Sequence, residues 1–125
     1  MLLTTLVVWA AVAAPASPQN LDHLQLGQLK AGQQIEITTT LRQYRATIVD
    51  PLSGEALVTV SNDGTRFSPP AKVFLIGATA GRYPEMMVKM GQLQVGLRIE
   101  LGLGSMAEAD RALSEPVKSL RIVHQ

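Results

Sequence analysis

The sequence predicts an all-β domain for the part of the chain that follows Ala31. Short segments there alternate apolar with polar residues and are rich in β-branched side chains, which is the pattern of half-buried strands. Turn residues separate these segments, above all Asn62-Asp63-Gly64, a sequence type that favours a tight β-hairpin. Short strands joined by tight turns are typical of a small antiparallel barrel.

Five strands are expected in chain order, at residues 35–38, 44–49, 56–61, 65–68 and 73–76. In the second strand, alternation places Tyr44, Ala46 and Ile48 on one face. A turn follows from Asp50 to Gly54, because proline fixes φ and glycine accepts a positive φ.

The last two expected strands are separated by Pro69 and Pro70. Because proline cannot donate a ladder hydrogen bond, the pair ends the fourth strand, and a short 3₁₀ turn is expected there. The fifth strand consists of four successive apolar residues, which predicts burial on both of its faces.

Two short motifs mark the segment from Gly32 to Ile76: Leu29, Gly32, Ile35 and Ile37 at its start, and Pro70, Lys72 and Ile76 at its end. With these motifs the segment resembles the small SH3-like and Sm-like barrels of exported bacterial proteins. The resemblance is one of architecture and implies a closed antiparallel barrel. The RNA-binding signatures of Sm-like proteins are not recognisable, so RNA binding is not implied.

An internal repeat accompanies this pattern. Residues 27–37 align without gaps to residues 91–101 and share six of eleven residues, and residues 68–76 align in the same order to 114–122. Duplication explains both matches. The alternative is folding pressure, because a glycine turn before an amphipathic strand is a common way to begin a barrel.

The second copy is shorter, which suggests a degenerate relative of the first. Where the first copy has its hairpin, Ser105 to Glu108 has the form of a capping box, and a short helix is expected over 106–113. We therefore expect an SH3-like barrel at residues 17–80 and a reduced second β repeat, packed on the first, at 81–125.

Residues 1–16 are predicted to be a signal peptide. Their apolar run of about 12 residues is shorter than the roughly 20 of a membrane span. Small residues favour cleavage after Ala13 or Ala16. Because no Lys or Arg precedes the run, an uncleaved anchor, a buried N-terminal helix and a misplaced start remain alternatives. The protein is expected to be periplasmic or secreted, with membrane contact only through an uncleaved leader.

Composition excludes several kinds of chemistry. Eleven basic and ten acidic residues give a net charge of +1, so no overall field attracts nucleic acid or anionic lipid. The chain has no cysteine, which excludes disulfides, thiol nucleophiles and cysteine zinc sites. His23 and His124 are expected to be solvated, with a joint metal site beside Asp22 or Glu85 as the alternative. No enzyme, cofactor or metal is expected.

Candidate binding residues lie at polar positions of the first repeat. They are Arg42, Tyr44, Arg45, Arg66 and Lys72, which on a curved sheet would form a basic, partly aromatic patch for an anionic ligand. The alternative is that strands simply place polar residues outward. Met86, Met87 and Met90 are expected to fill a gap in the core or, alternatively, to form a partner surface.

The function expected from these features is that of a non-enzymatic, exported module for protein-protein contact or envelope assembly. Its partner would be a protein of the cell envelope that adds to exposed strand edges. The alternative is a cytoplasmic Sm-like barrel associated with nucleic acid. A hydrolase or its accessory subunit has no support beyond the expected location.

Overall fold

The computed structural model describes residues 19–81 and 88–123, and it confirms the predicted all-β class. Its strands are β1 (Gln19–Leu21), β2 (His23–Gln25), β3 (Gln34–Thr39), β4 (Gln43–Asp50), β5 (Glu55–Ser61), β6 (Ala71–Thr79), β7 (Val88–Met90), β8 (Gln92–Gln94), β9 (Arg98–Leu103), β10 (Arg111–Leu113) and β11 (Val117–Val123). Two short 3₁₀ helices are present, η1 (Leu26–Gln28) and η2 (Glu108–Asp110). Among the described residues, no helix is long and apolar enough to cross a membrane.

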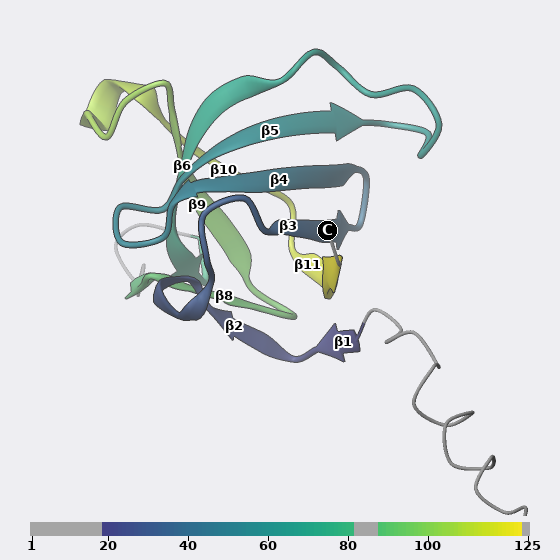
Figure 1. The fold of residues 1–125 in the computed structure, drawn as a ribbon, viewed down its shortest axis with the longest axis horizontal. Helices are drawn as coiled ribbons and strands as arrows, with labels where there is room; N and C mark the ends of the chain where they lie inside the picture. The colour runs from purple at the N-terminus through teal and green to yellow at the C-terminus, as the bar shows by residue number, and fades with distance from the viewer. Residues whose placement is uncertain (1–18, 82–87, 124–125) are drawn as a thin grey trace, which may run out of the picture.

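Nine strands form one antiparallel sheet with the order β1-β11-β3-β4-β5-β6-β9-β10, and β7 also pairs with β6. β2 and β8 form a separate pair. Figure 1 shows the large sheet as strongly curved. Its pairing path is open, because β1 and β10 lie at its two ends, so the sheet does not form the closed cylinder expected from the sequence. At the open side, Val117 donates to the carbonyl of Leu97 at 2.9 Å and accepts from Gly96 at 2.8 Å.

The hydrophobic core lies on the inner face of the curved sheet, because alternate residues of a strand point to the same side. In β3 and β4, Ile35 lies opposite Ala46 and Ile37 lies opposite Tyr44, and all four are buried. Ile48 is buried as well, so the predicted inward face of this strand is confirmed.

The strand expected at 73–76 is longer in the structure, where β6 has nine residues. Val73, Leu75 and Ile76 are buried, whereas Phe74 remains partly exposed on the outer face. Burial on both faces is therefore found for part of the strand.

The two repeated segments adopt the same local structure. Gly32 and Gly96 both have positive φ, at 91° and 94°. The residue after each glycine donates to the carbonyl three residues before it, at 3.0 and 3.2 Å. Gly32 then donates to the carbonyl of Ile48 at 2.7 Å, as Gly96 does to that of Val117. β3 pairs with β11 and β9 pairs with β6, so strands from both expected halves share one sheet.

The helix expected over 106–113 is wrong, because η2 and β10 occupy this segment. The Ser105 hydroxyl accepts from the Ala107 N–H at 3.1 Å, as a cap would, but it also donates to Asp110 Oδ2 at 2.7 Å. Arg111 to Leu113 then pair with β9, which ends the helical turn.

The strand expected at 65–68 and the 3₁₀ turn expected at the prolines are also absent from the structure. Asp63 Oδ1 accepts the backbone N–H groups of Thr65 and Arg66 at 2.8 and 3.0 Å. These bonds hold the backbone in a turn instead of a ladder. Only Ser68 returns to β5, where its N–H donates to the carbonyl of Val60 at 2.8 Å.

Candidate functional site

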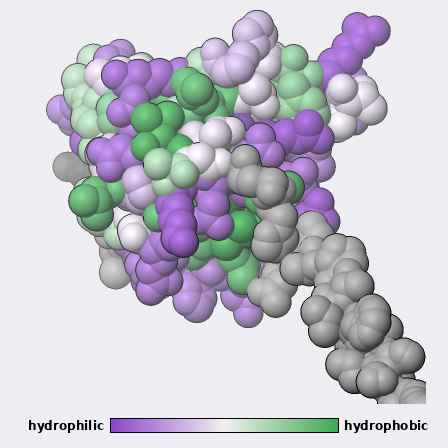
Figure 2. Space-filling model, viewed as in Figure 1, coloured by the Kyte–Doolittle hydropathy of each residue, from purple (hydrophilic) through white to green (hydrophobic). Residues whose placement is uncertain are grey.

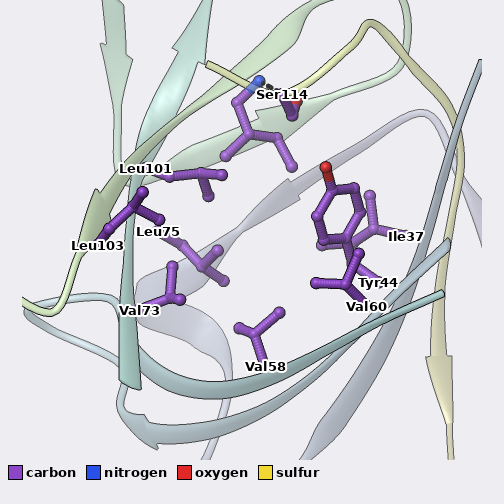
Figure 3. A pocket seen from close by; sticks show the side chains of 10 residues that line it. Ile37, Tyr44, Val58, Val60, Val73, Leu75, Leu101, Leu103 and Ser114 are labelled. Carbon is purple, nitrogen blue, oxygen red and sulfur yellow. Dashed lines mark hydrogen bonds between the residues drawn. The ribbon is translucent and has the colours of Figure 1, made fainter. Parts of the chain in front are cut away.

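An apolar pocket lies at the end of the sheet where β3 and β9 finish and β4 and β6 begin. Its cavity volume is about 70 Å³. Its lining residues are Ile37, Tyr44, Val58, Val60, Val73, Leu75, Ile99, Leu101, Leu103 and Ser114. Figure 3 shows these side chains around a common space. Leu75 and Ile99 are buried, whereas Leu103 is 52% exposed and therefore lies at the rim of the pocket.

A cluster of hydrogen-bonded polar groups, the polar wall, lies beside the apolar lining of this pocket and is organised by Glu115. Its Oε1 accepts hydrogen bonds from Thr39 Oγ1 at 2.8 Å and from the Tyr44 hydroxyl at 3.3 Å. Arg42 Nε lies 3.8 Å from Glu115 Oε2. The carboxylate therefore ties the end of β3 and the start of β4 to the segment before β11.

Ser114 completes the polar wall. Its hydroxyl accepts the N–H of Ile99 at 2.9 Å and donates to the carbonyl of Glu115 at 2.7 Å. Figure 3 shows the Tyr44 hydroxyl directed toward the side of the pocket where Ser114 lies. Throughout the described part of the chain, every buried side-chain nitrogen or oxygen has a hydrogen-bond partner. The pocket thus presents an apolar surface to an incoming group.

The Tyr44 phenol provides a direct test of the polar wall. Burial, and then the negative charge of Glu115, raise the pKa of this phenol above its usual 10.0. Because the folded state favours the neutral phenol, the free energy of unfolding is expected to fall as pH rises above the unfolded-state pKa of about 10. Glu115→Gln is expected to lower the pKa of Tyr44, because it removes the charge and keeps an acceptor.

The chain has two tyrosines, Tyr44 and Tyr83. Absorbance titration in a Tyr83→Phe background therefore measures the pKa of Tyr44 alone. The same background with Glu55→Gln removes a carboxylate from another part of the sheet and serves as the control. An identical Tyr44 titration with and without Glu115 would contradict the role of this carboxylate.

The predicted binding residues do not form a single patch. Tyr44 and Arg45 are neighbours in β4, so their side chains point to opposite faces of the sheet. Arg42 and Tyr44 meet at Glu115. Lys72 lies on the outer face of β6, with its Nζ 5.3 Å from the ring centroid of Phe74.

Arg45 and Arg66 belong to the outer side as well. The Arg45 guanidinium lies 4.1 Å from the ring centroid of Phe67. Arg66 is exposed in the segment between β5 and β6. The binding role of all five residues remains a prediction, and the structure divides them between two surfaces.

Sequence reasoning missed Glu115 and Ser114 as parts of a site. Glu115 is 76 positions from Thr39 and 71 from Tyr44. No local pattern connects such distant residues. The alignment of 68–76 with 114–122 identified their segment, but only as part of a repeat.

The remaining candidates from the sequence are the two histidines with their acidic neighbours and the methionines. Within 19–81 and 88–123, no three or more His, Cys, Asp or Glu residues are grouped to hold a metal ion. His23 is exposed on β2. Met90 is 68% exposed, so the expectation that it fills the core is wrong. Glu85, Met86, Met87, His124 and the leader at 1–16 lie outside the described residues.

The fold and the pocket define an all-β protein built on a curved antiparallel sheet, with an apolar pocket at one end. In comparisons with known proteins, no family model, no curated protein and no solved structure matches this chain.

Proposed function

We propose that this protein is a non-enzymatic, exported module that binds a protein partner through the pocket at the end of its sheet. The observation that carries the proposal is the apolar lining beside a polar wall whose groups are already bonded within the protein. At about 70 Å³, the cavity is half the size of one that admits benzene, about 150 Å³. A drug-sized ligand needs about 300 Å³ or more, so a small aliphatic side chain is the better fit.

The strand that borders the pocket suits a partner segment in extended form. β10 ends the sheet path, and Ala112 lies opposite Leu101, which lines the pocket. A segment that adds to β10 through main-chain hydrogen bonds would present alternate side chains to the pocket and to the Leu103 rim. This geometry favours a partner with aliphatic residues at every second position.

Site-specific photocrosslinking in living cells tests the proposal. A photoreactive residue at Leu103 is expected to capture an envelope protein. Lys30 is exposed and precedes the first residue of β3, whereas the pocket lies near the last residues of that strand. The same photoreactive residue at Lys30 is expected to capture no envelope protein. Equal products from both positions, or no product from Leu103, would disprove the pocket as the contact site.

A pocket-filling variant gives a second prediction. Val73→Ile adds one methyl group to the pocket wall and is expected to stabilise the protein by about 0.5 to 1 kcal/mol, because it fills empty apolar space. Urea unfolding measures the change. Val49→Ile is the matched control, since Val49 is 42% exposed, and it should change stability little. A destabilised Val73→Ile variant would show that the cavity cannot accept another carbon atom.

Export is part of the proposal and rests on the apolar leader. Intact-mass measurement of the fractionated protein is expected to find a periplasmic or secreted chain that begins at Ala14 or Ser17. A full-length chain in the cytoplasm would instead favour the Sm-like, nucleic-acid-associated alternative.

We also propose that the fold is an SH3-like barrel with one open seam, and that its second half arose from the first by duplication. The contacts of Val117 with Gly96 and Leu97 support the first part, because they connect the start of β11, next to one end of the sheet path, with the turn before β9, next to the other end. The matching turns at Gly32 and Gly96, and the pairing of β3 with β11 and of β9 with β6, support the second.

A further inference from the structure

A second surface lies on the outer face of β3, β4 and β5, on the opposite side of the sheet from the pocket. A groove of about 360 Å³ runs there between Arg45, Thr47, Leu57, Thr59, Phe67 and Pro70. Figure 2 shows hydrophobic and hydrophilic residues interspersed on the face of the molecule that Figure 1 presents. The groove combines a cation, hydroxyl groups and apolar side chains, so it differs in chemistry from the pocket.

Beside the groove, two positively charged side chains flank a single negatively charged one. The sheet register places Arg121 opposite Glu36, and Glu36 opposite Arg45. Glu36 Oε1 accepts a short hydrogen bond from Arg121, whereas the Nε of Arg45 lies 3.7 Å from Glu36 Oε2. Two guanidinium groups therefore share one carboxylate, which is bonded more closely to Arg121. Arg45 retains capacity for another anion.

Arg45 is also held in position. Its guanidinium lies over the ring of Phe67 at 4.1 Å from the centroid, and its side chain remains 46% exposed. Stacking uses the flat face of a guanidinium and leaves its N–H edge available for bidentate contact with a carboxylate. An arginine held in this way loses little conformational freedom when it binds.

Lys72 provides a second cation beside the groove, on the strand next to Leu57. It lies opposite Leu57, which is two residues along β5 from Thr59, the partner of Arg45. Standard strand spacings place the Cα atoms of Arg45 and Lys72 about 12 Å apart. Two carboxylates four residues apart in an extended chain lie on the same side, about 13 Å from each other.

We infer that this groove binds an extended acidic segment of a protein, with one carboxylate on Arg45, another on Lys72, and an aliphatic side chain between them on Leu57. Nucleic acid fits less well, because Glu36 and Glu55 place negative charge on the same face and part of the groove lining is apolar. This inference does not depend on the pocket, so each site can fail alone.

Titration of the isotope-labelled protein with the peptide Glu-Thr-Val-Thr-Glu, blocked at both ends, tests the inference by NMR. The chemical shifts of backbone amides are expected to change in β4, β5 and the segment before β6. A higher salt concentration should weaken binding. The matched peptide Gln-Thr-Val-Thr-Gln should bind at least about tenfold more weakly, because it lacks the charged acceptors. Equal affinity for the two peptides would overturn the inference.

Variants of the protein locate the site. Arg45→Gln is expected to weaken binding about tenfold, and Arg45→Lys, which keeps the charge without the fork, should fall between this variant and the unmodified protein. Lys89→Gln removes an exposed charge from β7 and should leave affinity unchanged. Circular dichroism confirms that each variant is folded. Unchanged affinity in Arg45→Gln, or an equal loss in Lys89→Gln, would place binding elsewhere.

Two further titrations distinguish other anions. Acetate at the carboxylate concentration of the peptide should produce much smaller shifts, and an oligouridylate should bind more weakly than the peptide. If acetate reproduces the shifts, the groove recognises any small carboxylate and the inferred peptide site is wrong. If the oligonucleotide binds more tightly, the inference fails in favour of nucleic acid.

Discussion

Replacing Gly54 by alanine is expected to lower the free energy of unfolding by about 3 kcal/mol or more. Gly54 has a φ of 80°, and an added Cβ would contact the backbone carbonyl oxygen of Leu75. That carbonyl has little room to retreat, because the Leu75 N–H donates to the carbonyl of Gly54 at 2.8 Å. The substitution would thus strain the turn and also separate it from β6.

Gly104→Ala is the matched control for this prediction. Gly104 has a similar φ of 84°, but an added Cβ would meet no atom within 4 Å. Only the conformational cost is expected there, about 1 kcal/mol. Urea unfolding followed by circular dichroism measures both variants. Equal losses of unfolding free energy would show that the close approach of Gly54 to β6 contributes nothing to the destabilisation.

Arg111→Met is expected to destabilise the protein by about 3 kcal/mol, because it leaves the Glu100 carboxylate buried without its partner. Glu100 is only 7% exposed, and Arg111 Nη1 lies 2.7 Å from its Oε2. The methionine retains much of the apolar stem of arginine, so the loss reports mainly on the carboxylate. Chemical denaturation at neutral pH provides the measurement.

The double variant Glu100→Met with Arg111→Met separates the charge effect from packing. Removing both partners is expected to cost much less than Arg111→Met alone, since no charge then remains buried. A double-mutant cycle gives the coupling between the two side chains. If the two single losses simply add, the ion pair is not the source of the destabilisation.

The parts of the fold that sequence reasoning predicted well are those with a strict local pattern. Apolar residues recur at every second position in two segments, at Ile35 and Ile37 and at Tyr44, Ala46 and Ile48. This spacing predicted the inner face of the sheet correctly, because a period of two leaves only one way to bury these side chains. The all-β class follows from such segments.

The wrong elements depend on competition between local and distant bonds. The hydrogen bond from the Ala107 N–H to the Ser105 hydroxyl is equally compatible with a long helix and with a single 3₁₀ turn, and pairing of β10 with β9 decides between them. Similarly, the carboxylate of Asp63 draws the next backbone N–H groups into a turn where a return strand was expected. Its pKa is held well below the ordinary range by these hydrogen bonds.

The pocket was hidden from sequence reasoning for a related reason. Its lining comes from five strands, and its polar wall is built around Glu115, which meets Tyr44 only after the chain has folded. Alternation showed that Tyr44 points inward, but it gave no information about which distant residue receives its hydroxyl. Patterns of this kind define faces well and sites poorly.

The pairing of β3 with β11 places a constraint on the order in which the molecule can form. Glu36 and Arg121 are 85 positions apart, and β1 pairs with β11 as well. During synthesis from the N-terminus, β1 and one edge of β3 therefore cannot pair with β11 until nearly the whole polypeptide has been made. Such distant contacts slow folding, because the entropy of closing a long loop is lost before the contact forms.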